Sequence, residues 1–286
     1  MLARAVLGDD CVAATVDHAL RPESALEAEA ASAFCENRGI PHATLRGALP
    51  ERSSATANLS ARARKLRYEL LEQHATAIRA RWIVTAHHAD DQLETVVMRL
   101  NRASGIAGLA GIRTRNGRIV RPLLEWRRAD LAAIVATSGV ACVADPTNDD
   151  DRYDRARLRK VLARADWLDA GKVATSARAL GEAEEAIEWA SWWFEGQSSV
   201  MVDGELIMNP TLLPAELRRR VLKRCLLRLA PESIVRDDGL NRLLVTLDGG
   251  GTATLCGVRC STSKVPGNDA LALRWHFRPA PPRRAT

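Results

Sequence analysis

The chain has 286 residues, of which 47% are hydrophobic and 27% charged. This composition is typical of a soluble globular protein, and at about 100 to 200 residues per domain it allows one large domain or two smaller ones. Lys and Arg outnumber Asp and Glu by 41 to 35, and the net charge of +6 favours acidic partners, with nucleic acid first among them.

The hydropathy and cysteine patterns argue against secretion and membrane insertion. No apolar run approaches the roughly 20 residues of a membrane helix, and residues 1–10 lack the apolar stretch of a signal peptide. The six cysteines are scattered, and the spacing of Cys256 and Cys260 fits neither a C-x-x-C redox pair nor a zinc knuckle. We therefore expect a cytoplasmic protein with reduced thiols, no membrane partner and no metal site.

Strands and helices alternate along the first hundred residues. Strands are predicted at 12–16, 42–45 and 82–86, and helices at 23–37, 58–74 and 90–101. Such alternation implies parallel strands joined by crossover helices. We therefore predict an α/β fold with a doubly wound parallel sheet, in which ligands bind at the carboxyl ends of the strands.

The pattern changes further along the chain. Asn116-Gly117 predicts a hairpin, and a helix is predicted at 127–138. Residues 152–195 are nearly all helix formers, with a break near 167–171, and helices at 214–230 and 238–247 and strands at 253–260 and 271–277 follow. These elements predict an α/β domain at 1–147, a helical connector at 148–197, a small α+β domain at 198–278 and a disordered tail at 279–286.

The densest group of polar residues lies at positions 86–95, with the sequence Ala-His-His-Ala-Asp-Asp-Gln-Leu-Glu-Thr. His87 and His88 end a predicted strand, and two aspartates begin the following helix. Aspartates at a helix start commonly cap its free N–H groups, and this structural explanation suffices for Asp90.

Asp91 and Glu94 carry the functional information of this segment. They are i, i+3 neighbours on one face of the helix, and the apolar stripe that should face the sheet is different, namely Leu93, Val96, Val97 and Leu100. Two carboxylates beside two histidines suit a cation, an amine or a metal, although the spacing matches no recognised zinc pattern. We favour a binding site over the alternative that the carboxylates only cap the helix.

Further cations and polar residues accompany this segment. The run at 60–68, Ser-Ala-Arg-Ala-Arg-Lys-Leu-Arg-Tyr, lies on a predicted helix and either contacts phosphate or forms a solvated face. Asp17 and His18 follow the strand at 12–16, at the same predicted edge of the sheet. The clusters at 218–220 and 223–224 are better explained as solvated surface than as RNA contacts.

Together these segments resemble one family, that of the tRNA(Ile)-lysidine synthases. Five segments in colinear order are similar to its signatures: Val-Asp-His-Ala-Leu-Arg-Pro-Glu-Ser at 16–24, Ala-Arg-Lys-Leu-Arg-Tyr at 63–68, the histidine segment at 86–95, Gly-Ile-Ala-Gly-Leu-Ala-Gly at 105–111 and Arg-Pro-Leu-Leu at 121–124. Each segment alone is weakly specific, whereas five in order are specific.

The resemblance implies a ligase of the PP-loop ATP pyrophosphatase superfamily, with an adenine-nucleotide alpha hydrolase-like fold. Such an enzyme uses ATP, with Mg²⁺ expected beside it, to adenylate C2 of the wobble cytidine in the isoleucine tRNA with a CAU anticodon. L-Lysine then displaces AMP to give lysidine. The implied partners are this tRNA and L-lysine, and a homodimer is left open.

The resemblance also implies residue roles by position. Asp91 and Glu94 would hold the ammonium groups of lysine, with Arg67 beside lysine and the nucleotide, and a dibasic amino acid indeed needs paired carboxylates. The other roles are His87 and His88 at the adenylation centre, Asp17 and His18 near the adenosine, and tRNA-facing cations at Arg64, Arg155, Arg157, Arg159 and Lys160. For residues 155–160 a solvated helix face is the alternative.

The chain departs from the family pattern at its beginning. The Ser-Gly-Gly-x-Asp-Ser loop, whose N–H groups cradle the ATP phosphates, occurs nowhere in the 286 residues. The strand before that loop would be central in a doubly wound sheet, so its absence would leave inner edges unpaired. We therefore expect the native protein to begin upstream, and we expect these 286 residues alone to bind ATP weakly or not at all.

Two alternatives to lysidine synthesis remain at this point. A tRNA thiolation enzyme of the same superfamily would need catalytic cysteines, and none lies near residues 85–112. A non-catalytic tRNA-binding protein would keep the basic surfaces after losing the phosphate loop.

Overall fold

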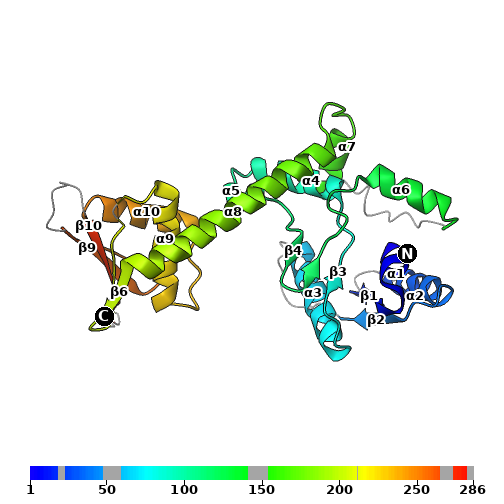
Figure 1. Ribbon diagram of the computed structural model, residues 1–286, viewed down its shortest axis with the longest axis horizontal. Coiled ribbons are helices and arrows are strands. Elements are labelled where there is room, and N and C mark those ends of the chain that lie inside the picture. The colour runs from blue at the N-terminus through cyan, green and yellow to red at the C-terminus, as the bar shows by residue number, and fades with distance from the viewer. Residues whose placement is uncertain (19–22, 48–58, 141–153, 211, 265–272, 282–286) are drawn as a thin grey trace. The chain divides into compact units, whose positions relative to one another are not determined.

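The structure, a computed structural model, describes residues 1–18, 23–47, 59–140, 154–210, 212–264 and 273–281. The chain divides into two compact units (Figure 1), one of Met1–Leu93 with Arg113–Gly171 and one of Glu94–Ile112 with Lys172–Thr286. No helix in the described ranges is long and apolar enough to cross a membrane. The domain boundaries at 147 and 197 stay predictions.

The first unit begins with a short helix, α1 (Leu2–Leu7), and a 3-10 turn at Gly8–Asp10. A parallel pair of strands then forms, in which β1 (Ala13–Asp17) lies beside β2 (His42–Arg46). Two longer helices follow these strands in the chain, α2 (Glu23–Glu36) after β1 and α3 (Leu59–Ala77) after β2. Helix α2 contacts β1 and β2, and α3 contacts both of them as well as β3, described next.

A three-stranded sheet completes the strands of this unit, in the order β3 (Ile83–Val84), β5 (Ile119–Val120), β4 (Arg115–Asn116). β3 and β5 are parallel, and β4 and β5 form the predicted hairpin. Gly117 in its turn has a φ of 58°, which glycine adopts without steric strain. The parallel pairing of an α/β fold is confirmed, and within the described residues these strands lie in two sheets.

Helix α4 (Ala89–Leu100) departs from its predicted apolar stripe. Leu93 is buried as predicted, but Leu100 is 57% exposed, so the prediction that the stripe faces the sheet along the whole helix is wrong at its end. The last turn is held instead by Arg99, which donates to two backbone carbonyls of residues 105–111. Three polar residues of α4 are buried as well, namely Gln92, Glu94 and Thr95.

The remaining helices follow the predicted order. The short α5 (Ile106–Leu109) follows α4, and α6 (Arg128–Thr137) follows the hairpin. The helix formers beyond residue 152 give α7 (Asp154–Leu162) and α8 (Ala170–Ser198), separated at 163–169, which overlaps the break predicted near 167–171 and begins before it. The tail at 279–286 falls partly outside the described residues.

The second unit contains an antiparallel sheet, in the order β6-β7-β10-β9-β8. The outer pair is β6 (Ser199–Val202) and β7 (Glu205–Met208), and β10 (Leu273–Pro279) is central. The predicted strand at 253–260 is instead two strands, β8 (Ala253–Leu255) and β9 (Val258–Lys264). Cys256 and Gly257 between them have φ of 52° and 74°, which turns the chain.

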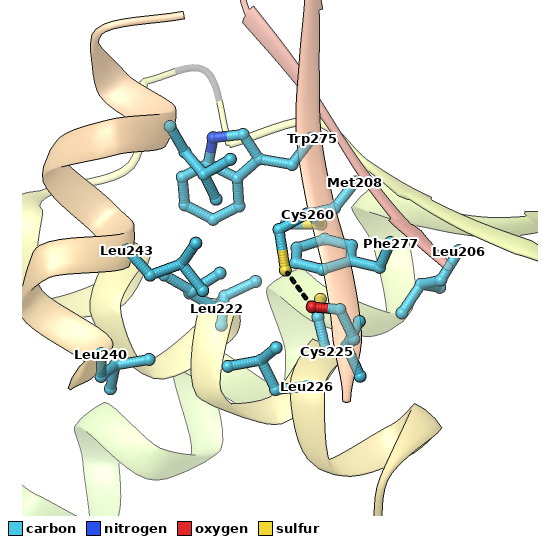
Figure 2. Packing of buried hydrophobic residues seen from close by; sticks show 13 residues of the cluster. Leu206, Met208, Leu222, Cys225, Leu226, Leu240, Leu243, Cys260, Trp275 and Phe277 are labelled. Carbon is cyan, nitrogen blue, oxygen red and sulfur yellow. Dashed lines mark hydrogen bonds between the residues drawn. The ribbon is translucent and has the colours of Figure 1, made fainter. Parts of the chain in front are cut away.

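Helices α9 (Ala215–Leu229) and α10 (Asp237–Asp248) cover this sheet and form a single apolar core with it. Trp275 and Phe277 of β10 are fully buried, with ring centroids 6.4 Å apart in an edge-to-face arrangement (Figure 2). Because aromatic side chains bury the most area, these two rings dominate the core. The small α+β domain that the sequence predicts is therefore present.

Candidate active site

The predicted site residues of the first unit follow the carboxyl ends of two strands. Asp17 ends β1, and His18 comes next. His87 and His88 lie between β3 and α4. Helix α3 connects the two places, because Arg67 contacts His18 and the charge of Arg64 acts on His87.

Asp17 is a buried carboxylate with structural contacts. It accepts a hydrogen bond from the Ser24 hydroxyl at 2.7 Å and lies 3.9 Å from the Arg46 guanidinium. It therefore ties the end of β1 to the first turn of α2 and to the end of β2. Burial of a carboxylate is tolerated because these partners compensate its charge.

His18 accepts a hydrogen bond from Arg67, whose Nε lies 3.4 Å from the ring Nε2. Burial lowers the pKa of His18, the positive charge of Arg67 lowers it further, and Asp17 partly opposes both effects. An uncharged imidazole can accept from a guanidinium, which agrees with this contact. The structure thus brings together three of the predicted site residues.

His87 is held in a cationic setting. Its Nδ1 lies 3.1 Å from the Thr85 hydroxyl. Burial is the largest cause that lowers the pKa of His87, to about 4; Asp91 opposes this shift, and the positive charges of Arg121, Arg64 and Arg155 add to it. At neutral pH the ring is therefore uncharged, and the cations around it can attract a phosphate group.

His88, Asp90 and Asp91 form a compact group at the start of α4. The His88 ring lies 3.6 Å from each carboxylate. Asp90 accepts a hydrogen bond from the backbone N–H of Arg128 at 2.7 Å. It therefore caps a helix as predicted, but that helix is α6 and not α4. Asp91 accepts from the backbone N–H of His88 at 3.1 Å, so Asp91 also caps α4.

Asp91 and Glu94 are both shielded from solvent. The Asp91 side chain is 17% exposed, and its Oδ1 lies 3.8 Å from the Arg159 guanidinium. Glu94, one turn further along α4, is 4% exposed. Two shielded carboxylates one turn apart on the same helix would attract a cationic ligand such as an ammonium group.

The cations expected to face tRNA lie on α3 and α7. Arg64 and Arg155 lie near enough to His87 to affect its pKa, and Arg159 lies beside Asp91. Arg157 forms an ion pair with Asp154 on its own helix, and Lys160 is exposed. The structure thus brings three of these five cations to the histidine and carboxylate group.

Two contributors were missed as site residues by the sequence reasoning. Arg121 is 4% exposed, donates to the Arg113 carbonyl at 2.7 Å, and acts on His87. Arg121 begins the Arg-Pro-Leu-Leu segment at 121–124, which could have identified it, but no role was predicted for this arginine. Thr85 contacts His87 directly, and nothing in its sequence position marks it.

The donor set of the site suits a nucleotide more than a metal held by the protein alone. Throughout the described ranges, no group of three or more His, Cys, Asp or Glu side chains is arranged to hold a metal ion. The arginines around His87 instead offer guanidinium groups, which match phosphate oxygens in geometry and charge.

Comparison with known proteins identifies the family of the chain. Residues 3–165 match the family described as the PP-loop domain, so the fold is that of a PP-loop domain, a class that uses ATP. The chain is 44% identical, over 97% of its length and 83% of the other, to the tRNA(Ile)-lysidine synthase of Novosphingobium aromaticivorans. It is 36% identical to that of Zymomonas mobilis, over 95% and 82%. The chain belongs to the tRNA(Ile)-lysidine synthase family, whose members are ligases.

A solved structure gives a weaker likeness. The U34-tRNA thiolase NcsA from Methanococcus maripaludis, with its [4Fe-4S] cluster, is 16% identical to the chain. The likeness covers 59% of this chain and 61% of the thiolase with a TM-score of 0.46, and it carries no functional inference.

Proposed function

We propose that the protein ligates L-lysine to C2 of the wobble cytidine in tRNA(Ile) with a CAU anticodon. ATP adenylates the cytidine with release of diphosphate, and an amine of lysine then attacks C2 and displaces AMP. The observation that carries the proposal is the shielded carboxylate of Asp91 beside His87 and His88, with the buried Glu94 one turn further along α4, in a chain that belongs to this family.

Lysine recognition follows from the two carboxylates. Free lysine carries two ammonium groups, and burial in α4 strengthens the attraction between a carboxylate and an ammonium group because water screens it less. In this proposal Asp91 and Glu94 hold the ammonium groups, and Arg67 lies beside lysine and the nucleotide.

The nucleotide would meet the cationic setting of His87. The positive charges of Arg64, Arg121 and Arg155 lower the pKa of this histidine, and they would equally stabilise the developing negative charge on diphosphate. Mg²⁺ carried in with ATP would supply further neutralisation of the phosphates. His88 completes the adenylation centre, and Asp17 and His18 would lie near the adenosine.

The tRNA would approach over the basic helices. Arg64 on α3 and the α7 cations Arg155, Arg157, Arg159 and Lys160 surround the entrance to the histidine group in this proposal. Guanidinium and ammonium groups bind phosphodiesters without base specificity, so these contacts would position the anticodon stem, and the site itself would select the cytidine.

Lysine incorporation into unmodified tRNA tests the proposal, with ATP and radiolabelled lysine supplied. Asp91→Asn keeps an oxygen that can accept from the His88 N–H, and Glu94→Gln keeps the side-chain volume, so both variants remove charge and preserve the helix start. We expect each to lower incorporation about 10- to 100-fold, the loss typical of one charged hydrogen bond. Glu232→Gln, at an exposed carboxylate of the second unit, is the control and should leave activity unchanged.

The same assay separates the alternatives. Wild-type incorporation by both variants would remove the site assignment, and tRNA binding without AMP formation would indicate a non-catalytic tRNA-binding protein. Sulfur transfer instead of lysine transfer would indicate a thiolation enzyme. Burial raises the pKa of Cys225, and raises that of Cys260 to about 12, so these two thiols are poor nucleophiles for such chemistry.

A further inference from the structure

A second basic surface lies at the amino end of β3, the end opposite the histidine group. The guanidinium carbons of Arg81 and Arg115 lie 5.4 Å and 4.5 Å from the centroid of the Trp82 ring. All three side chains are exposed, Trp82 by 36%. Cation–π contact with one ring therefore holds two guanidinium groups from separate chain segments close together at the surface.

Arg118 fixes the hairpin that carries Arg115. Its guanidinium donates to the Thr76 hydroxyl at 3.0 Å and to the Glu72 carboxylate at 3.3 Å. The same group also donates to the carbonyl oxygens of Ala75 and Ala80. Arg118 thus uses its charge within the fold, and it anchors the β4–β5 hairpin to the end of α3 and to the segment that precedes Arg81.

The surface carries a marked excess of positive charge. Residues 72–82 and 113–118 contain five arginines (Arg79, Arg81, Arg113, Arg115 and Arg118) and one acidic residue, Glu72, which gives a net charge of +4. The Glu72 carboxylate forms an ion pair with Arg118. Within the described part of the chain, no carboxylate forms an ion pair with Arg79, Arg81 or Arg115. Such a surface raises the local concentration of polyanions.

Arg79 occupies a backbone position that favours glycine. Its φ is 55°, in the left-handed region. Its N–H bonds to the Thr76 carbonyl and that of Ala80 to the Ala75 carbonyl, which is the Schellman pattern at the end of α3. An arginine at this position adds a positive charge at the cost of backbone strain. Replacing it with glycine would remove the charge and relieve the strain.

We propose that Arg79, Arg81, Trp82 and Arg115 form a second RNA-binding surface, which takes the phosphodiester backbone of tRNA away from the wobble nucleotide. Guanidinium groups bind phosphate oxygens in a bidentate manner, and the aromatic ring keeps two of them oriented before RNA arrives. The inference rests on the proposed function for the identity of the RNA as tRNA. It predicts contacts that position the tRNA and do not read its sequence.

Salt dependence of tRNA binding tests this surface, measured on the full chain without ATP or lysine. The Arg81→Gln, Arg115→Gln double variant should reduce the slope of log K against log salt by about two, close to one for each phosphate that the variant no longer binds. Affinity should fall equally for tRNA(Ile) and for an unrelated tRNA. Arg242→Gln, which removes an exposed arginine from α10, is the matched control and should leave the slope unchanged.

Arg79→Gly separates binding from folding. Glycine relieves the left-handed backbone, so the melting temperature should stay equal or rise, while the salt slope falls by about one. An unchanged slope in both the double variant and Arg79→Gly, or an equal change in Arg242→Gln, would overturn the inference. Because the assay needs no catalysis, failure of lysine incorporation would overturn the proposed function and leave this result standing.

Discussion

The two units of the chain differ in what they bury. In the described residues, every large side chain that is less than 2% exposed belongs to the second unit, including Trp275, Phe277 and Leu222. The first unit buries mainly small residues, such as Ala28 and Ala63, together with the charged side chains Asp17 and Arg121. The second unit is therefore organised around large apolar side chains, whereas the described core of the first unit is made mainly of smaller ones.

This difference bears on which unit is the more stable and on where the candidate site residues lie. Burial of large apolar side chains contributes about 1.5 to 3 kcal/mol each, whereas a hydrogen bond contributes about 1 kcal/mol net. The second unit should thus be the more stable of the two. Elements that bind ligands are commonly drawn from the less stable parts of a protein, which agrees with the place of His87 and Asp91.

Trp275→Ala should be the most damaging change to the second unit. The ring is fully buried between β10 and the helices, so its removal leaves a cavity and should lower the free energy of unfolding by about 3 to 5 kcal/mol. Urea unfolding followed by circular dichroism measures this. Trp189→Ala removes a ring that is 63% exposed and should change the value by less than about 0.5 kcal/mol. Equal effects of the two variants would contradict the apolar organisation of this unit.

Arg220→Met tests a place where the second unit relies on charge. Arg220 is 9% exposed and donates to Glu184 at 2.7 Å, to Glu216 at 2.7 Å and to Glu188 at 3.0 Å. Its removal leaves Glu184 shielded without its cation. We expect a destabilisation of roughly 2 to 3 kcal/mol, below the value for a fully buried pair because Glu188 and Glu216 are partly exposed.

The control for Arg220 is a pair of the same type at the surface. Arg178 and Glu182 are one turn apart on α8, 3.4 Å from each other, and both are more than half exposed. Arg178→Met should therefore change the free energy of unfolding by at most about 0.5 kcal/mol. If the two arginines prove equivalent, the ion pairs between α8 and α9 add nothing beyond ordinary surface charge.

Local patterns in the sequence predicted much of the fold. Helix α2 begins at the predicted residue and ends one residue early, and the Asn116-Gly117 hairpin forms as expected. The prediction was wrong at 253–260, because a left-handed Cys256 ends a strand that its composition would continue. Strand propensity does not reveal a backbone angle of this kind.

The candidate site was predictable in composition and less so in contacts. The segment at 86–95 identified the histidines and carboxylates, but Asp90 caps α6, which lies 38 residues further along the chain. Arg220 belongs to a run expected to be solvated, and its partner Glu184 is 36 residues away. Such pairings depend on tertiary packing, and the periodicity of one sequence contains no information on them.

The pH dependence of stability should also differ between the two units. We expect this effect to be smaller than those of Trp275→Ala and Arg220→Met. Burial and nearby arginines lower the pKa of His87 to about 4, and the pKa of His18 is also lowered. In the unfolded chain a histidine has a pKa of about 6.5, so between these values the unfolded state binds more protons than the folded state. Stability of the first unit should therefore rise with pH in this window, and it should fall as the pH is lowered from 7 to 5.

His87→Gln should reduce that fall, because glutamine does not titrate, and the remaining change should come from His18. The second unit contains neither histidine and serves as the internal reference. Hydrogen exchange at pH 7 and pH 5, read separately for amides of each unit after correction for intrinsic rates, measures both stabilities in one sample. A pH dependence of the first unit that is unchanged by His87→Gln would mean that the pKa of His87 is the same in the folded and the unfolded chain. The burial and cationic setting described for His87 would then be wrong, and with them the argument that positive charge at this place attracts a phosphate.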